Sequence, residues 1–117
     1  MNHPSQKEMV VMCDVDETLV LWHQGVSDVY ITDPYGIDGA QIALKRHNRH
    51  IKLLKDKSKR GYYIIVWSAG GEAWANAVVD ALGIRDFVND VIAKPVCFID
   101  DLPAEAILVN RVYLEDK

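Results

Sequence analysis

Short apolar runs alternate with amphipathic segments along this 117-residue chain. The run that opens the pattern, 9–13, lacks polar alternation and is rich in strand-forming residues, as expected of a strand that is covered on both faces, and a strand is expected over 9–15. Further strands are expected at 62–67, 90–93, 96–99 and 111–114. Because strands that alternate with helices build a parallel sheet with right-handed crossovers, the pattern predicts an α/β fold.

Two helices are expected between these strands, over 39–60 and 72–82, with a short helical turn near 103–109. Asp38 and Gln41 suggest a capping box that opens the first helix, and Gly83 suggests a left-handed cap that ends the second. Each helix carries an inward stripe at a spacing of three or four residues. The first stripe comprises Ala40, Leu44, His47, Ile51 and Leu54, and the second comprises Trp74, Ala77, Val78, Ala81 and Leu82.

The segment 19–37 precedes the first expected helix. Its two apolar stretches, 19–23 and 28–32, could pair as a β-hairpin across residues 24–27. This hairpin is expected to form a flap over the end of the first strand.

Composition indicates a single domain over residues 1–117, since half of the residues are hydrophobic and a chain of this length can bury a sizeable core. No apolar stretch is long enough to span a bilayer, and the first eight residues are polar. Cys13 and Cys97 fall inside expected strands and resemble reduced core thiols. A cytoplasmic protein is therefore expected.

The net charge is −4, and the four acids Asp14, Asp16, Asp100 and Asp101 account for this excess. A cluster of basic residues lies between 45 and 60, where a solvated helix face is the better interpretation. Nucleic acid is therefore expected only as a substrate, and no membrane partner is expected.

Candidate catalytic residues lie where the apolar runs end. Asp14, Asp16 and Thr18 form a D-x-D-x-T motif after the first run, and ligands of open α/β sheets bind at such strand ends. Two carboxylates this close repel each other unless a cation or a shared proton compensates. Ser68 follows the run 62–67 and precedes Ala69 and two glycines, a natural anion cradle at a helix start. Lys94 precedes the run 96–99, which ends in Asp100 and Asp101. Lys94 is expected to reach Asp14, because the connector leaves the strand 90–93 at the same edge of the sheet.

These four motifs, in this order, resemble those of the haloacid dehalogenase superfamily, and the resemblance spans residues 9–101. It implies a three-layer α/β sandwich with a central, mostly parallel sheet of the Rossmannoid kind. Large members of the family insert a cap domain after the first motif or after the third strand. Here the stretches between Thr18 and Asp38 and between Asp90 and Lys94 are too short for one, so the chain resembles a small capless member whose flap spans about 19–37.

The resemblance also implies a Mg²⁺-dependent phosphomonoester hydrolase, a phosphatase. Asp14 would be the nucleophile that forms an aspartyl-phosphate, and Asp16 would be the general acid and base. Ser68, Ala69, Lys94 and Thr18 would bind or frame the phosphate, and Trp22 and His23 on the flap would contact the substrate. The metal ligands would be Asp14, Asp16 through its backbone carbonyl, and Asp101 with Asp100 close by.

Two departures from the family pattern concern Lys94 and the C-terminal end. The family usually places the lysine at the start of a helix, whereas here Pro95 leads directly into the expected strand. The chain after Asp101 is short and would leave a thin sheet edge, so a monomer or a weak homodimer is expected. Two alternatives remain open: a polynucleotide-end (3′-) phosphatase, and a non-catalytic phosphate- or metal-binding module.

Overall fold

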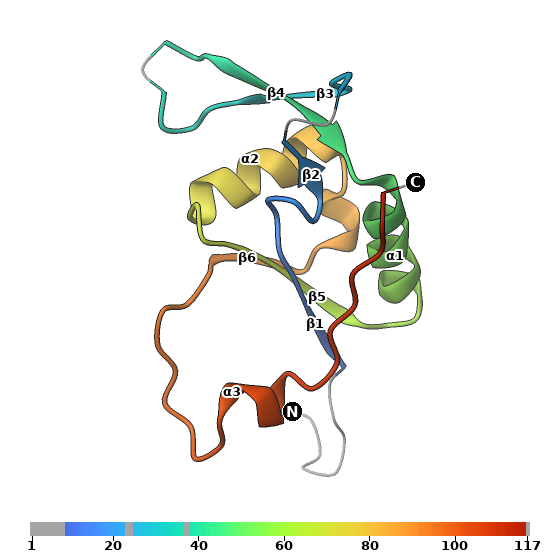
Figure 1. Cartoon of the computed structure of the whole chain (residues 1–117), viewed down its shortest axis with the longest axis vertical. Coiled ribbons are helices and arrows are strands. Elements are labelled where there is room, and N and C mark those ends of the chain that lie inside the picture. The colour runs from blue at the N-terminus through green and yellow to red at the C-terminus, as the bar shows by residue number, and fades with distance from the viewer. Residues whose placement is uncertain (1–8, 23–24, 37, 117) are drawn as a thin grey trace.

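Three parallel strands form the main sheet of this computed structural model, which describes residues 9–22, 25–36 and 38–116 (Figure 1). They are β1 (Val10–Cys13), β5 (Tyr63–Ser68) and β6 (Asp90–Ala93), in the order β1-β5-β6. The central strand, β5, buries Ile64 and Val66 completely. The strands predicted at 9–15, 62–67 and 90–93 are therefore confirmed.

Helices α1 (Asn48–Lys59) and α2 (Glu72–Leu82) flank this sheet (Figure 1). The bounds of α2 are those predicted, and Gly83 ends the helix at a φ of 68°, in the left-handed conformation. A short 3₁₀ turn, η1 (Arg85–Phe87), then leads into β6. α2 contacts β3, β5 and β6, and its Val78 and Val79 are fully buried. The main sheet and its two helices thus build the α/β core that the pattern predicted.

A second, antiparallel sheet consists of β2 (Val20–Leu21), β4 (Gln41–Arg46) and β3 (Val29–Thr32), and we call it the flap sheet. The predicted hairpin between 19–23 and 28–32 is wrong, because β2 and β3 both pair with β4 and not with each other. The predicted helix over 39–60 is wrong in its first part for the same reason. In β4, Ile42 and Leu44 are more buried than Gln41 and Ala43, a spacing of two that a strand satisfies once β3 offers it a ladder of hydrogen bonds.

The start of α1 also differs from the prediction. Asp38 does not cap a helix, since its Oδ1 accepts a hydrogen bond from the N–H of Ala40 in a local turn (3.2 Å). The cap is His47, whose Nδ1 accepts a hydrogen bond from the N–H of His50 (3.2 Å). The crossover helix is therefore shorter than predicted, and the flap sheet is larger.

The chain after β6 departs most from the prediction. Strands at 96–99 and 111–114 are absent, and α3 (Ala104–Ile107) is the one regular element within 94–116. A parallel neighbour for β1 requires a crossover of about a dozen residues, whereas only Lys94 and Pro95 separate β6 from residue 96. Residues 111–114 pair with no strand and run beside His47 and His50 instead.

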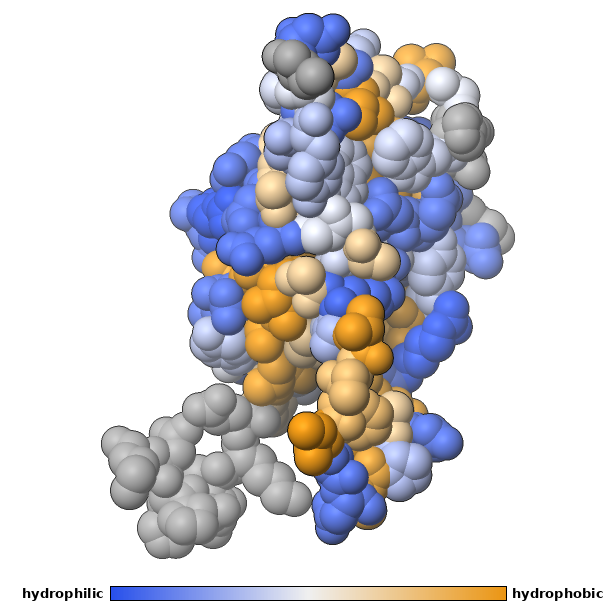
Figure 2. Space-filling view, turned by 90° about the vertical axis from the view of Figure 1, so that its left-hand side faces the viewer, coloured by the Kyte–Doolittle hydropathy of each residue, from blue (hydrophilic) through white to orange (hydrophobic). Residues whose placement is uncertain are grey.

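This part of the chain exposes many apolar side chains. Figure 2 shows them gathered over the lower part of the molecule, where the loop after β6 and α3 lie. The exposed residues are Val96, Phe98, Ile99, Leu102, Ile107, Leu108, Val109 and Val112. Contiguous apolar surface of this kind marks an interaction site more often than a solvated loop.

Two stacked histidines hold the C-terminal segment against α1. His47 and His50 are both buried, with ring centroids 3.7 Å apart. The N–H of Leu114 donates to Nε2 of His50 (2.8 Å), so His50 carries its proton on Nδ1, which donates to the carbonyl of Thr18 (2.7 Å). Nε2 of His47 donates to the carbonyl of Leu114 (2.9 Å). The stacked pair therefore ties this segment to the turn after β1.

In the part of the chain that the structure describes, no helix combines the length and the apolar character needed to cross a membrane.

Stability should fall as the pH drops below about 6.5. Burial lowers the pKa of His50 from 6.5, and the neighbouring His47 and Arg49 add to this, while the bond to Thr18 opposes it. The edge of the Tyr113 ring covers the pair. The folded state keeps His50 neutral where the unfolded chain takes up a proton, so the stabilisation is complete above pH 6.5 and is lost as the pH falls toward the lowered pKa.

Urea unfolding at pH 5, 6 and 7 measures this dependence. His50→Gln, which has no proton to take up, should flatten it. Asp116→Asn is the matched control, because Lys45 lowers the pKa of Asp116 from 3.8 and this group does not titrate between pH 5 and 7. An unchanged pH dependence in His50→Gln would contradict the assigned role of the histidine.

Candidate active site

The turn after β1 presents the two aspartates of the D-x-D-x-T motif. The N–H groups of Thr18 and Leu19 both donate to the carbonyl of Val15 (3.1 and 2.8 Å). Glu17 has a φ of 61°, in the left-handed region that non-glycine residues rarely adopt. The hydroxyl of Tyr113 donates to the carbonyl of Glu17 (2.7 Å), so the C-terminal segment supports this strained turn. Backbone strain of this kind collects at functional sites.

Asp14 has two partners, one for each carboxylate oxygen. Lys94 Nζ lies 3.4 Å from Asp14 Oδ1, and Thr18 Oγ1 donates to Asp14 Oδ2 (3.3 Å). Lys94 reaches this position because its N–H donates to the carbonyl of Ser68 (2.8 Å), which extends the pairing of β5 with β6 by one residue. Both side chains of the ion pair are more than one-third exposed, so the pair adds little to stability. The expected contact of Lys94 with Asp14 is present.

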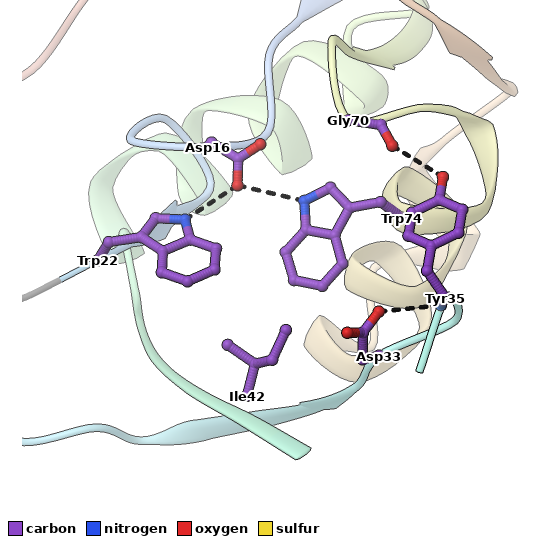
Figure 3. Close-up of a pocket in the computed structure, with 7 residues that line it drawn as sticks. All are labelled: Asp16, Trp22, Asp33, Tyr35, Ile42, Gly70 and Trp74. Atoms are coloured by element: carbon purple, nitrogen blue, oxygen red, sulfur yellow. Dashed lines mark hydrogen bonds between the residues drawn. The ribbon is translucent and has the colours of Figure 1, made fainter. Parts of the chain in front are cut away.

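Asp16 accepts two indole N–H groups on one oxygen. Trp22 Nε1 lies 2.9 Å and Trp74 Nε1 lies 3.2 Å from Asp16 Oδ1 (Figure 3). The two indole rings are tilted by 38°, with centroids 6.1 Å apart. Because both donors engage Oδ1, a proton on this carboxyl group would reside on Oδ2. The flap sheet and α2 thus hold one carboxylate between them.

A pocket of about 390 Å³ opens beside Asp16. Figure 3 shows the rings of Trp22 and Trp74 facing it, with Ile42 across from them and Tyr35 at one side. Asp33 and Gly70 complete the lining. The aromatic and aliphatic lining suits an apolar or planar group held next to the carboxylate.

Ser68 and the glycines shape the turn between β5 and α2. Ser68 is fully buried, and its Oγ accepts a hydrogen bond from the N–H of Gly70 (3.0 Å). Gly71 has a φ of 100° and lies directly before the first residue of α2. The hydroxyl of Tyr35 donates to the carbonyl of Gly70 (2.8 Å). The strand, the glycine turn and the helix start therefore follow each other as predicted, with Ala69 inside the turn.

Asp100 and Asp101 do not lie with Asp14 and Asp16. They occupy the exposed loop that runs away from the sheet after β6 (Figure 1), where Asp100 Oδ1 accepts a bond from the N–H of Leu102 (2.9 Å). The residues described contain no cluster of three groups able to hold a metal ion. The donor set that the motifs imply for Mg²⁺ is thus incomplete within one chain.

His23 lies outside the described residues. Cys13 is buried at the end of β1, and this burial, together with the charge of Asp14, raises its pKa to about 12. Its thiol is therefore unreactive at neutral pH, in agreement with a packing role.

Sequence reasoning missed Trp74 as a site residue and assigned it to the apolar stripe of α2. Its indole N–H was the available signal, because a buried indole N–H requires an acceptor. Ile42 and His50 carried no comparable signal.

No family model, curated protein or solved structure matches this chain. The superfamily resemblance therefore rests on the four motifs alone.

Replacing Gly71 with alanine should distort the glycine turn. An added Cβ would lie 2.5 Å from the Tyr35 hydroxyl oxygen, and a φ of 100° is unfavourable for any side chain. We expect a loss of about 2–4 kcal/mol in unfolding free energy, measured by urea denaturation.

Gly39→Ala is the matched control. Gly39 also has a positive φ, but its Cβ would meet nothing within 4 Å, so only the backbone cost applies. In a Tyr35→Phe background, Gly71→Ala should cost less. Equal costs at the two glycines would mean that Tyr35 does not lie over the turn.

Proposed function

We propose that this chain is a phosphomonoester hydrolase, a small capless member of the haloacid dehalogenase superfamily that acts through an aspartyl-phosphate on Asp14. One observation carries this proposal: Lys94 and Thr18 hold the two oxygens of Asp14 at the sheet edge where the glycine turn begins α2. A carboxylate that must attack an anionic phosphate needs a fixed orientation and a nearby cation. Thr18 supplies the first and Lys94 the second.

In the first step, an oxygen of Asp14 bonds to phosphorus and the bond from phosphorus to the leaving oxygen breaks. The leaving alkoxide takes a proton from Asp16. In the second step, water attacks phosphorus and gives its proton to Asp16, which releases phosphate and regenerates Asp14. Each step restores the charge state that the next one requires.

The environment of Asp16 suits this double role. Its Oδ1 is engaged by the indoles of Trp22 and Trp74, so Oδ2 is the oxygen that exchanges the proton. The adjacent pocket would then receive the leaving group, whose oxygen must come within hydrogen-bond reach of Oδ2. The N–H groups of Gly70 and Gly71 are bonded to Ser68, so the N–H groups of the first turn of α2, at its positive end, would face the phosphate.

Mg²⁺ is the proposed cofactor, but the acids of a single chain do not complete its site, because Asp100 and Asp101 lie elsewhere. When bound, the ion would neutralise phosphate charge beside Asp14, and each role in the two steps above belongs to a residue of the chain. This gap favours the non-catalytic phosphate-binding module as the second candidate. Such a module would bind inorganic phosphate without turning over any ester.

Replacement of Asp14 and of Asp16 by asparagine should affect turnover in different ways. Asp14→Asn loses the attacking oxygen and should abolish turnover. Asp16→Asn keeps the nucleophile and should slow turnover of an alkyl phosphate by roughly 10²–10⁴-fold. Its effect on an aryl phosphate should be smaller, because that leaving group needs little protonation.

Steady-state hydrolysis of both ester classes measures these effects. Asp56→Asn is the control, since this exposed acid of α1 lies outside the site. Equal losses for the two ester classes in Asp16→Asn would contradict its role as general acid. Wild-type protein that hydrolyses neither ester would favour the binding module.

A further inference from the structure

The run Val96–Ile99 has the composition of a buried strand but lies in solvent. Val96 is 102% exposed, Ile99 100% and Phe98 53%. Burial of these side chains would stabilise the fold, because it removes apolar surface from water. This run therefore has the residues of a strand but no partner to pair with.

β1 has one edge that is not paired with another strand. It pairs with β5 on one side, and no strand among the described residues pairs with its other side. An unpaired edge presents a row of free backbone N–H and carbonyl groups that recruits another strand. The chain thus carries both a free strand and a free edge, and they do not meet.

The connector explains why they do not meet within one chain. The way from β6 to the free side of β1 crosses three strand spacings, roughly 14 Å, before any return along the strand. From Ala93 to Val96 the chain can span only about 11 Å, even when it is fully extended. Lys94 and Pro95 therefore cannot place the run on the β1 of its own chain. Short hinges of this kind favour exchange of a segment between two copies.

We propose that residues 96–101 are exchanged between two copies of this chain, so that each run adds to the free edge of the other copy's β1 as a parallel strand. Aligning Val96–Ile99 with Val10–Cys13 puts Asp100 level with Asp14 of the other copy, about 4.8 Å away. The segment 102–112 can span roughly 40 Å, so the C-terminal residues can stay on His47 and His50 during the exchange.

The exchange would supply the acids that the site lacks. Each of the two symmetry-related sites would combine Asp14 and Asp16 of one copy with Asp100 and Asp101 of the other. Carboxylates from both copies then offer the oxygen ligands that Mg²⁺ prefers. This part rests on the proposed function, whereas the exchange itself rests on strand geometry.

Measurement of the oligomeric state tests the exchange independently of enzymatic activity. Sedimentation of the unmodified chain should give twice the chain mass of 13.2 kDa. Inserting about twelve glycine and serine residues between Lys94 and Pro95 should convert the dimer to a monomer, because the run can then reach its own β1. The same insertion after Gly25, in the flap, is the control and should leave a dimer. The proposal is overturned if the unmodified chain is a monomer, or if the chain stays a dimer after the insertion between Lys94 and Pro95.

A crosslink tests the register. In Val11→Cys, the introduced thiol should form a disulfide with the natural Cys97 of the other copy, since the alignment places these two residues side by side. Non-reducing electrophoresis should show a covalent dimer, which Cys97→Ser abolishes. A disulfide within one chain, or none, contradicts the exchange.

Mixed dimers test the shared site. Asp14→Asn and the double variant Asp100→Asn, Asp101→Asn should each be inactive alone in buffer with Mg²⁺. Unfolded together and refolded, they should regain about one quarter of wild-type activity, because half of the dimers carry one intact site. No recovery from an active wild type overturns the shared site. An inactive wild type that still exchanges its strand overturns the proposed function and leaves the exchange standing.

Discussion

Two carboxylates placed two residues apart at the end of β1 set the main constraint on this structure. They repel each other, and side chains from three separate parts of the chain contact them and offset the repulsion. Lys94 comes from the end of β6 to Asp14, and Trp22 and Trp74 come from the flap sheet and α2 to Asp16. The elements around the turn thus supply a cation to Asp14 and two hydrogen-bond donors to Asp16. A site with this geometry is suited to reactions in which one anion attacks another.

The two-residue connector after β6 is the second constraint. It allows Lys94 to reach Asp14, because the lysine extends the ladder beyond Ser68, but it prevents the next apolar run from crossing the sheet. The same short segment therefore completes one side of the site and leaves the other side open. In the proposed exchange, a second copy of the chain supplies a strand for the unpaired edge of β1 and the acids that the site lacks.

The sequence predicted the parallel core because its strands and α2 carry strong local signals: unbroken apolar runs, a glycine turn and a glycine cap. It failed at 41–46, where the spacing fits a helix and a strand equally well and the partner strand β3 decides. It failed again at 96–99, because an apolar run shows that a strand is favoured but not whether the chain can reach a neighbour. In the site, the pairing of Asp14 with Lys94 followed from strand order. The bond from Trp74 to Asp16 did not, because it joins residues that are far apart along the chain and meet only in the folded core.

The aspartyl-phosphate on Asp14 is the central claim, and chemical trapping tests it most directly. Wild-type protein quenched during turnover of an aryl phosphate and reduced with borohydride should yield homoserine at position 14, since reduction converts an acyl-phosphate to an alcohol. Peptide mass spectrometry would locate the change, with protein reduced in the absence of substrate as the reference. Turnover accompanied by homoserine at position 14 supports the account. Trapping that finds homoserine at another acid, or substrate turnover with none anywhere, would contradict it.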